Sequence, residues 1–253
     1  MVFHTNNRFF YYLCGEIMAN DYFQFKQFTV HQKRCAMKVG TDGTLLGAWA
    51  QVPTASSRIL DIGTGTGLIA LMMAQRFPQA SVLGIDIDKD AVCQAQENVS
   101  ISPFSSRINI QEKNVLNFND TEGFNAIVCN PPYFVNALVC PDQQRTMARH
   151  TISLTFEGLM ESAFRLLKPD GLFSLVIPTE SRSQLETEAH INGFFLSRVC
   201  LVRTTPNKQQ KRQLIELTKH PVNKLNIEEG IIEDSPNNRS IWYQQLTQDF
   251  YIR

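Results

Sequence analysis

The stretch Asn130-Pro131-Pro132-Tyr133 follows a short apolar run that is typical of a buried strand. Two consecutive prolines lack backbone donors and have a fixed φ, so neither fits inside a helix or a paired strand. The chain is therefore expected to be stiff where this strand ends. The amide oxygen of Asn130 and the carbonyl of Pro131 are hydrogen-bond acceptors at this strand end, and the ring of Tyr133 offers a stacking face for a planar group.

A second set of residues, Asp61 with Gly63, Gly65 and Gly67, connects a strand-like run to a helix-like run. Glycine backbone at such a turn can approach a ligand closely. Asp86 ends the next strand-like run, a position from which a carboxylate binds ribose hydroxyls. Since an acid directly before the loop would repel a pyrophosphate but suits a positive charge, these residues predict a site for a cationic nucleoside cofactor.

Alternating strand-like and helix-like runs surround both sets of residues. Strands are expected over 58–62, 81–86, 108–113, 124–130 and 172–178, and helices over 67–77, 89–100 and 155–167. This order predicts an α/β protein with a mostly parallel sheet and helices on both faces. Two further strand-like runs, 193–204 and 212–219, are joined by a polar, basic turn and predict a C-terminal antiparallel hairpin that completes a seven-stranded sheet.

Four regions are expected along the chain. Residues 1–20 are interpreted as a disordered extension, or as the product of a start assigned too early, with translation beginning at Met1 or Met18. Residues 21–57 form a lead-in that contributes to the cofactor site, and 58–219 form the core. Residues 220–253 are interpreted as an exposed linker followed by a tail, whose last thirteen residues form a short docked helix.

The glycine loop, with the sequence DIGTGTG, resembles the first motif of the class I S-adenosylmethionine-dependent methyltransferases, which have a Rossmann-like fold. The resemblance implies that S-adenosylmethionine lies over this loop with its ribose on Asp86, beside Ile87. It also places Asn114 and Val115 next to the adenine ring. Many members of the family have an acid at the position of Asn114, so this residue is a departure from the family pattern.

The tetrapeptide at Asn130 resembles the motif of the amino-methyltransferases, which act on the exocyclic nitrogen of a base or on a glutamine amide. In that fold the strand before the tetrapeptide ends beside the methyl group of the cofactor. The resemblance therefore implies that Asn130, Pro131, Pro132 and Tyr133 form the catalytic site. Alignment of the nitrogen with the methyl group would then carry most of the rate, without an acid of special pKa.

A narrower resemblance is carried by residues 38–47, 130–134 and 145–150 and spans residues 20–220. These segments are similar to the bacterial transfer-RNA methyltransferases that modify N6 of the adenine beside the anticodon, position 37, in valine tRNA. The resemblance implies contacts to the methionine end of the cofactor, whose ammonium suits a carboxylate. The residues in those contacts are Lys38, Thr41, Asp42 and Gly43.

A tRNA substrate would have to be met by a local positive patch. The chain has 24 Lys and Arg residues and 24 Asp and Glu residues, so no overall field attracts a polyanion. The residues expected to contact tRNA around a flipped-out base are Phe134, Arg145, Arg149, His150, Lys208, Lys211 and Arg212. The three cations of the hairpin fit an ordinary solvated surface equally well.

Composition limits the remaining possibilities. The six cysteines show no CxxC pair and no histidine at metal-ligand spacing, so no metal is expected. The apolar run near the N-terminus is too short to cross a membrane, and a cytoplasmic monomer or weak dimer is expected. Three alternatives stay open: a ribosomal RNA guanine-N2 methyltransferase, a protein-glutamine N5 methyltransferase, and a catalytically dead RNA-binding scaffold. The second normally has a helical N-terminal domain, for which residues 1–57 are too short.

Overall fold

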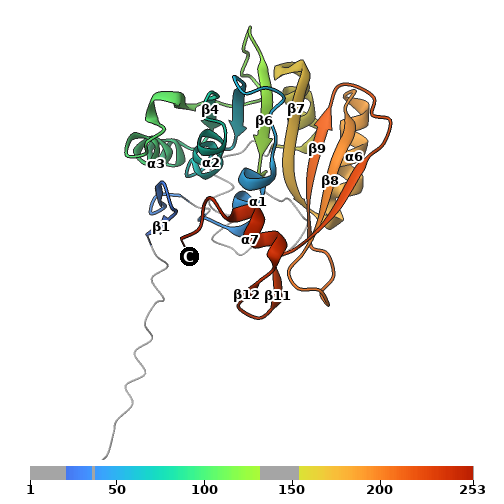
Figure 1. Cartoon of the computed structure of the whole chain (residues 1–253). Helices are drawn as coiled ribbons and strands as arrows, with labels where there is room; N and C mark the ends of the chain where they lie inside the picture. Colours follow the sequence, from blue (N-terminus) through green and yellow to red (C-terminus); the bar gives the residue numbers. More distant parts are fainter. Residues whose placement is uncertain (1–20, 36–37, 132–153, 253) are drawn as a thin grey trace, which may run out of the picture.

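The computed structural model describes residues 21–35, 38–131 and 154–252, and within them one sheet of eight strands dominates (Figure 1). The strand order is β10-β8-β9-β7-β6-β3-β4-β5. The strands are β3 (Arg58–Ile62), β4 (Ser81–Asp86), β5 (Ile108–Glu112), β6 (Phe124–Cys129), β7 (Leu167–Pro178), β8 (Phe195–Arg203), β9 (Arg212–Thr218) and β10 (Asn226–Ile231). Strands β3 to β7 are parallel to their neighbours among themselves, whereas β9 runs antiparallel between β7 and β8.

Helices cover both faces of this sheet. They are α1 (Thr41–Trp49), α2 (Leu68–Arg76), α3 (Lys89–Ser100), α5 (Phe156–Leu166), α6 (Arg182–Ile191) and α7 (Ile241–Thr247), with short 3-10 turns η1 (Ser105–Arg107) and η2 (Thr179–Ser181). Two buried clusters result, one beneath α1, α2, α3 and α7 and the other beneath α5 and α6. The predicted Rossmann-like architecture with a parallel core and a C-terminal antiparallel pair is confirmed.

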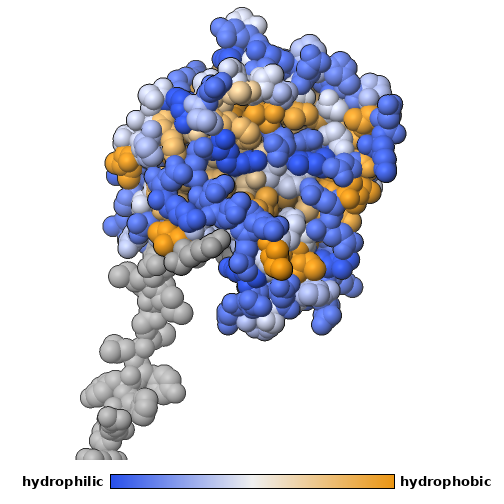
Figure 2. Space-filling view, in the orientation of Figure 1, coloured by the Kyte–Doolittle hydropathy of each residue, from blue (hydrophilic) through white to orange (hydrophobic). Residues whose placement is uncertain are grey.

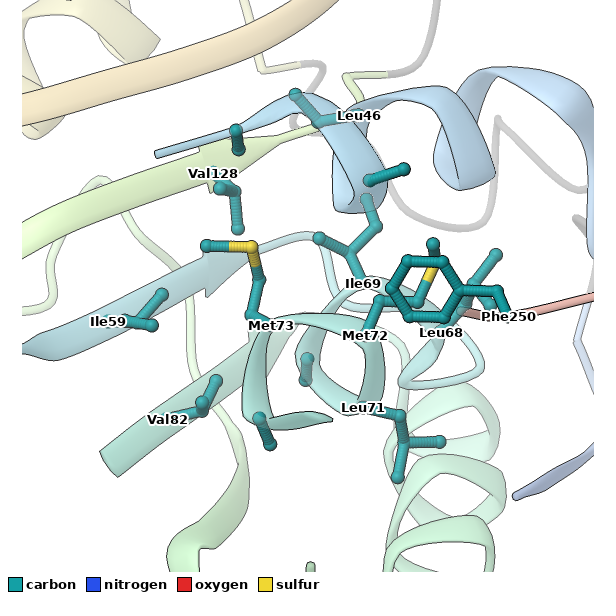
Figure 3. Packing of buried hydrophobic residues seen from close by; sticks show 14 of the residues in the cluster. Leu46, Ile59, Leu68, Ile69, Leu71, Met72, Met73, Val82, Val128 and Phe250 are labelled. Carbon is teal, nitrogen blue, oxygen red and sulfur yellow. The ribbon is translucent and has the colours of Figure 1, made fainter. Parts of the chain in front are cut away.

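The first cluster fixes the positions of the helices that carry the candidate site. Figure 3 shows Ile59 and Val128 on the strands facing Leu46 of α1 and Met73 of α2, with Phe250 closing the cluster from the C-terminal segment. All are nearly inaccessible to solvent. Because packing of this density fixes the position of α2, it also fixes the loop that precedes α2.

Helices α1 and α2 approach each other closely because two glycines of α1 face α2. A Cβ added to Gly47 would lie 2.7 Å from Met72 Sδ and 2.9 Å from Met72 Cβ, and one added to Gly43 would lie 3.2 Å from Leu68 Cδ2. Such distances leave no room for a larger residue at Gly47. The N-terminus of α1 is thereby held against the first turn of α2, directly after the glycine loop.

The lead-in before α1 forms a small hairpin of β1 (Tyr22–Gln24) and β2 (Thr29–His31). The side chain of Asn98 in α3 accepts a hydrogen bond from the backbone N–H of His31 and donates to its carbonyl, each at 2.8 Å. The same amide donates to the carbonyl of Thr66 in the glycine loop at 2.9 Å. One buried side chain thus ties the lead-in to the loop.

The C-terminal part differs from the sequence-based expectation. The prediction of an exposed linker over 220–240 is wrong, because Asn226–Ile231 forms β10, which pairs in parallel with β8 and adds an eighth strand. A small hairpin of β11 (Glu233–Ser235) and β12 (Asn238–Arg239) follows. The predicted docked helix is confirmed as α7, with Tyr243 and Phe250 buried. The region boundaries proposed from the sequence stay predictions.

The start of β7 also differs from the sequence-based expectation. Strand β7 begins at Leu167, five residues before the predicted strand over 172–178, and its pairing with β6 is irregular at that end. In the ranges that the structure describes, no helix has the length and apolar character needed to cross a membrane. Figure 2 shows a visible face that is mainly hydrophilic and interrupted by smaller apolar areas.

Candidate active site

The glycine loop follows β3 with an open, left-handed backbone. The φ angles of Gly63 and Gly65 are 68° and 54°, in a region that other residues rarely adopt. Among the described residues, a Cβ at Gly63 would meet no atom within 4 Å, and one at Gly65 would meet only the carbonyl of Gly63, at 4.0 Å. A Cβ added to the third glycine, Gly67, would lie 3.3 Å from Ala95 Cβ. The lack of a side chain at Gly67 therefore permits close packing of α2 on α3. The backbone of the first two glycines is therefore open to a ligand.

The carboxyl group of Asp61 lies beneath this loop and is fully buried. Its Oδ2 accepts hydrogen bonds from Thr64 Oγ1 at 2.7 Å and from the N–H of Ala70 at 3.1 Å. Its Oδ1 has no hydrogen-bond partner in the part of the chain that the structure describes. Burial raises the pKa of Asp61 to about 7, and the two hydrogen bonds only partly oppose this.

Asp86 at the end of β4 contacts the same loop. Its Oδ2 accepts the N–H of Gly65 at 2.9 Å, and its Oδ1 accepts the N–H of Asp88 at 3.0 Å. Burial raises the pKa of Asp86, against the effect of these hydrogen bonds. The next residue, Ile87, keeps 44% of its surface exposed and presents an apolar side chain at this edge. Asp86 therefore holds the loop in place from the position expected for ribose binding.

Two residues predicted to contact adenine lie beyond β5. Asn114 Oδ1 accepts the N–H of Leu116 at 3.0 Å, which fixes a local turn. The side chain of Val115 is buried in the second cluster, and its carbonyl accepts a hydrogen bond from Arg165 Nη2 at 3.1 Å. Any contact of Val115 with a ligand would therefore involve its backbone.

The end of β6 lies beside the start of the glycine loop. Cys129 pairs with Ile62 of β3 on one side and with Leu175 of β7 on the other, so Asn130 and Pro131 follow at the level of Gly63. This neighbourhood was expected from the sequence. The other predicted residues of this loop lie outside the described residues; they are Pro132, Tyr133, Phe134, Arg145, Arg149 and His150.

The remaining predicted residues lie at the same edge of the sheet. Lys38, Thr41, Asp42 and Gly43 surround the start of α1, and Asp42 Oδ1 lies 2.6 Å from Arg212 Nε. Lys208 and Lys211 are exposed in the connection from β8 to β9, and the carbonyl of Lys211 accepts the N–H of Thr179 after β7. The structure thus separates Arg212, which is ion-paired beside α1, from the two exposed lysines.

Sequence reasoning missed the polar residues that support the site. Thr64 binds Asp61, Asn98 joins the lead-in to the loop, and Gln94 Oε1 accepts the N–H of Arg34 at 3.3 Å. Gln94 and Asn98 occupy the buried face of α3, one turn apart. Polar residues at helical spacing on an apolar face are the signal that could have identified them.

Buried acidic groups and open backbone fit a cofactor with a cationic centre. Within the described ranges, no three His, Cys, Asp or Glu side chains gather as they would around a metal ion. Asp61, one oxygen of which has no hydrogen-bond partner among the described residues, supplies negative charge below the loop. Gly63 and Gly65 leave space above it.

Known proteins are similar to this chain in sequence and in fold. The model of the methyltransferase small domain family matches residues 43–205. A protein of Bacteroides thetaiotaomicron named tRNA1(Val) (adenine(37)-N6)-methyltransferase is 48% identical over 93% of this chain and 99% of its own length. A protein of the same name from Vibrio cholerae is 39% identical over 93% of this chain and 97% of its own length.

Solved structures share the fold. A protein of Agrobacterium tumefaciens described as a predicted O-methyltransferase superposes with a TM-score of 0.65 and 20% identity, over 83% of this chain and 96% of the other. The glycopeptide N-methyltransferase MtfA, in complex with S-adenosylmethionine, superposes with a TM-score of 0.54 and 13% identity, over 73% and 90% of the two chains.

The parallel sheet, the glycine loop and the carboxylates near the ends of β3 and β4 define a class I methyltransferase that uses S-adenosylmethionine. Within that class, the chain belongs to the family of the tRNA1(Val) (adenine(37)-N6)-methyltransferases. The predicted fold, enzyme class and cofactor are thereby confirmed. The roles of individual site residues stay predictions.

Proposed function

We propose that this chain transfers a methyl group from S-adenosylmethionine to N6 of adenine 37 in a valine tRNA. The observation that carries the proposal is the 48% identity over 93% of the chain to a relative with that name. The neighbourhood of Asn130 and the glycine loop supports it, because the acceptor amine and the donor must meet there.

The residues after β6 are suited to an amino group conjugated to a ring. S-adenosylmethionine supplies an electrophilic methyl carbon on a positively charged sulfur. The lone pair of N6 is delocalised into the ring, so the nitrogen is a poor nucleophile. Hydrogen bonds accepted by the Asn130 amide oxygen and the Pro131 carbonyl would hold both N6 protons and direct the lone pair out of the ring. Tyr133 would stack on the flipped base.

The remaining substrate contacts are proposed from position and charge. Lys208 and Lys211 lie at the edge of the sheet where β6 and β7 end, so they would meet tRNA phosphates near the site. Arg145 and Arg149 are proposed to do the same from the loop after Asn130. The enzyme is proposed to act in the cytoplasm as a monomer or weak dimer.

A labelled-methyl assay tests the proposal. Purified protein would be incubated with labelled S-adenosylmethionine and an unmodified valine tRNA transcript, followed by nucleoside analysis. We expect label in N6-methyladenosine, and no label in a transcript in which guanine replaces adenine 37. Label in ribosomal RNA guanine or in a protein glutamine, with none in this tRNA, would favour the corresponding alternative.

A further inference from the structure

The contact between Arg212 and Asp42 joins two segments that are far apart in the sequence. Arg212 begins β9, and Asp42 lies in the first turn of α1. Arg212 Nε lies 2.6 Å from Asp42 Oδ1, and the two side chains keep 24% and 25% of their surface exposed. Arg212 uses Nε for this contact, which leaves its two Nη groups available to another acceptor. They make no hydrogen bond within the described part of the chain.

The alternation of side chains along the strands places Arg212 on the same side of the sheet as the candidate site. Leu214 of β9 packs in the cluster beneath α1 and α2, so Arg212, two positions earlier, faces the same way. Val128 of β6 packs in that cluster too, and continuing the alternation puts Asn130 on this side. Strand β9 lies two strands from β6, which corresponds to roughly 10 Å.

A buried polar group adds a second observation at this position. Gln210 lies two residues before Arg212, and its Nε2 is buried with no hydrogen-bond partner among the described residues. An amide N–H and a guanidinium are both donors, and a carboxylate accepts from both. The surroundings of Arg212 therefore have donor capacity for an anionic group in addition to Asp42.

We infer that Asp42 and Arg212 together bind the amino-acid end of S-adenosylmethionine. That end carries an ammonium and a carboxylate on one carbon, and an adjacent aspartate and arginine present the opposite charges. Asp42 binds the ammonium, and the Nη groups of Arg212, with Gln210, bind the carboxylate. The ion pair holds both side chains in position before the cofactor arrives, which lowers the entropic cost of binding.

This inference assigns Arg212 to the cofactor site, whereas sequence reasoning grouped it with Lys208 and Lys211 as a tRNA contact. It rests on S-adenosylmethionine as the cofactor and does not depend on which acceptor is methylated. An assay without RNA therefore tests it separately from the proposed function.

Calorimetry with two ligands provides the test. S-adenosylhomocysteine has the complete amino-acid end, whereas 5′-methylthioadenosine shares the adenosine and the sulfur but lacks it. We expect Arg212→Ala to weaken binding of the first by about tenfold or more, the effect of losing hydrogen bonds to a charged group, and to change binding of the second by less than about twofold. Arg203→Ala is the matched control, because Arg203 pairs with Glu229 at 3.7 Å on the neighbouring strand. It should change neither affinity.

Arg212→Lys separates binding from folding. Lysine keeps the charge but not the forked geometry, so S-adenosylhomocysteine should bind with an affinity between those of the wild type and Arg212→Ala. The inference is overturned if Arg212→Ala weakens both ligands equally, or neither. If Arg212→Ala does not fold, a folded Arg212→Lys with the wild-type ratio of the two affinities would overturn it, and a reduced ratio would support it.

Discussion

Asp61 allows a quantitative test of whether a buried carboxyl group lowers the free energy of unfolding while it favours cofactor binding. Its pKa is raised from 3.8 to about 7 by burial. Because the folded-state pKa lies above the unfolded one, the folded protein holds the extra proton between these values. The contribution of Asp61 to stability is therefore greatest below about pH 4 and falls as the pH rises toward 7. Asp61→Asn removes the ionisation and keeps an oxygen that can accept the hydrogen bonds of Thr64 and Ala70.

The magnitude follows from the two pKa values. At about 1.4 kcal/mol per pH unit, the rise from 3.8 to about 7 corresponds to a penalty of up to about 4 kcal/mol at pH 8. The cost of burying the asparagine N–H₂ does not depend on pH, so it cancels when the difference between variant and wild type is compared at two pH values. We expect this difference to move in favour of Asp61→Asn by about 2–4 kcal/mol between pH 4.5 and pH 8.

Denaturant unfolding measures the effect. The fluorescence of Trp49, which is buried, reports the loss of structure in both proteins without cofactor. A stability difference that stays constant from pH 4.5 to pH 8 would refute the reasoning, because it would mean that Asp61 titrates normally in the folded state.

The affinity for the cofactor should show the opposite pH dependence from the stability. The positive charges of S-adenosylmethionine favour the ionised carboxylate, so wild-type affinity should rise between pH 5.5 and pH 7.5. Asp61→Asn should bind more weakly at pH 7.5 and lose this pH dependence. The same pH profile in both proteins would show that Asp61 does not contribute to cofactor affinity through its charge.

Three further predictions concern other parts of the site. Asn130→Ala should lower methyl transfer by about 100-fold or more while leaving cofactor affinity nearly unchanged, as kinetics and calorimetry would show; wild-type turnover would contradict its proposed role. Gly47→Ala should lower the free energy of unfolding by about 1–3 kcal/mol, because its Cβ would overlap the adjacent methionine of α2. Gly40→Ala, whose Cβ would have its nearest neighbour at 3.7 Å, is the control, and equal losses would argue against the close helix contact. Replacing Lys208 and Lys211 together by alanine should reduce the salt dependence of tRNA binding by about one to two units of slope, and identical slopes would mean that this turn does not meet RNA.

The parts of the fold that the sequence predicts well are those whose side chains are buried on both faces. Strands such as Arg58–Ile62 and Phe124–Cys129 are mainly apolar and largely buried, and their order with the helices predicts the parallel core. Strand β10 was missed because it is an edge strand. Ile227 is 56% exposed, and the two glutamates beside it are typical of a loop as much as of an edge.

The residues of the candidate site also differ in how well the sequence predicts their neighbours. The glycine loop and Asn130 are local motifs, so their types and spacing were sufficient to predict them. The contact of Asp42 with Arg212 joins residues from opposite ends of the chain, and no local pattern connects the two. A cluster of cations in a turn looks the same in a sequence whether its members meet solvent, RNA or a partly buried acid. The structure distinguishes these cases, because the pairing of β9 with β7 places Arg212 next to Asp42 of α1.

The two ends of the described chain meet in the folded protein. The backbone N–H of Lys26 donates to the carbonyl of Phe250 at 2.8 Å, and the ring of Phe25 stacks on Tyr251 with centroids 5.8 Å apart. During synthesis the segment around Phe25 therefore emerges long before its packing partners exist. The lead-in can acquire its final support only after α7 has been made, so it should be the final part of the described fold to mature. A bulky fusion placed directly after the last residues should disturb methyl-donor binding more than the position of the C-terminus in the sequence would indicate.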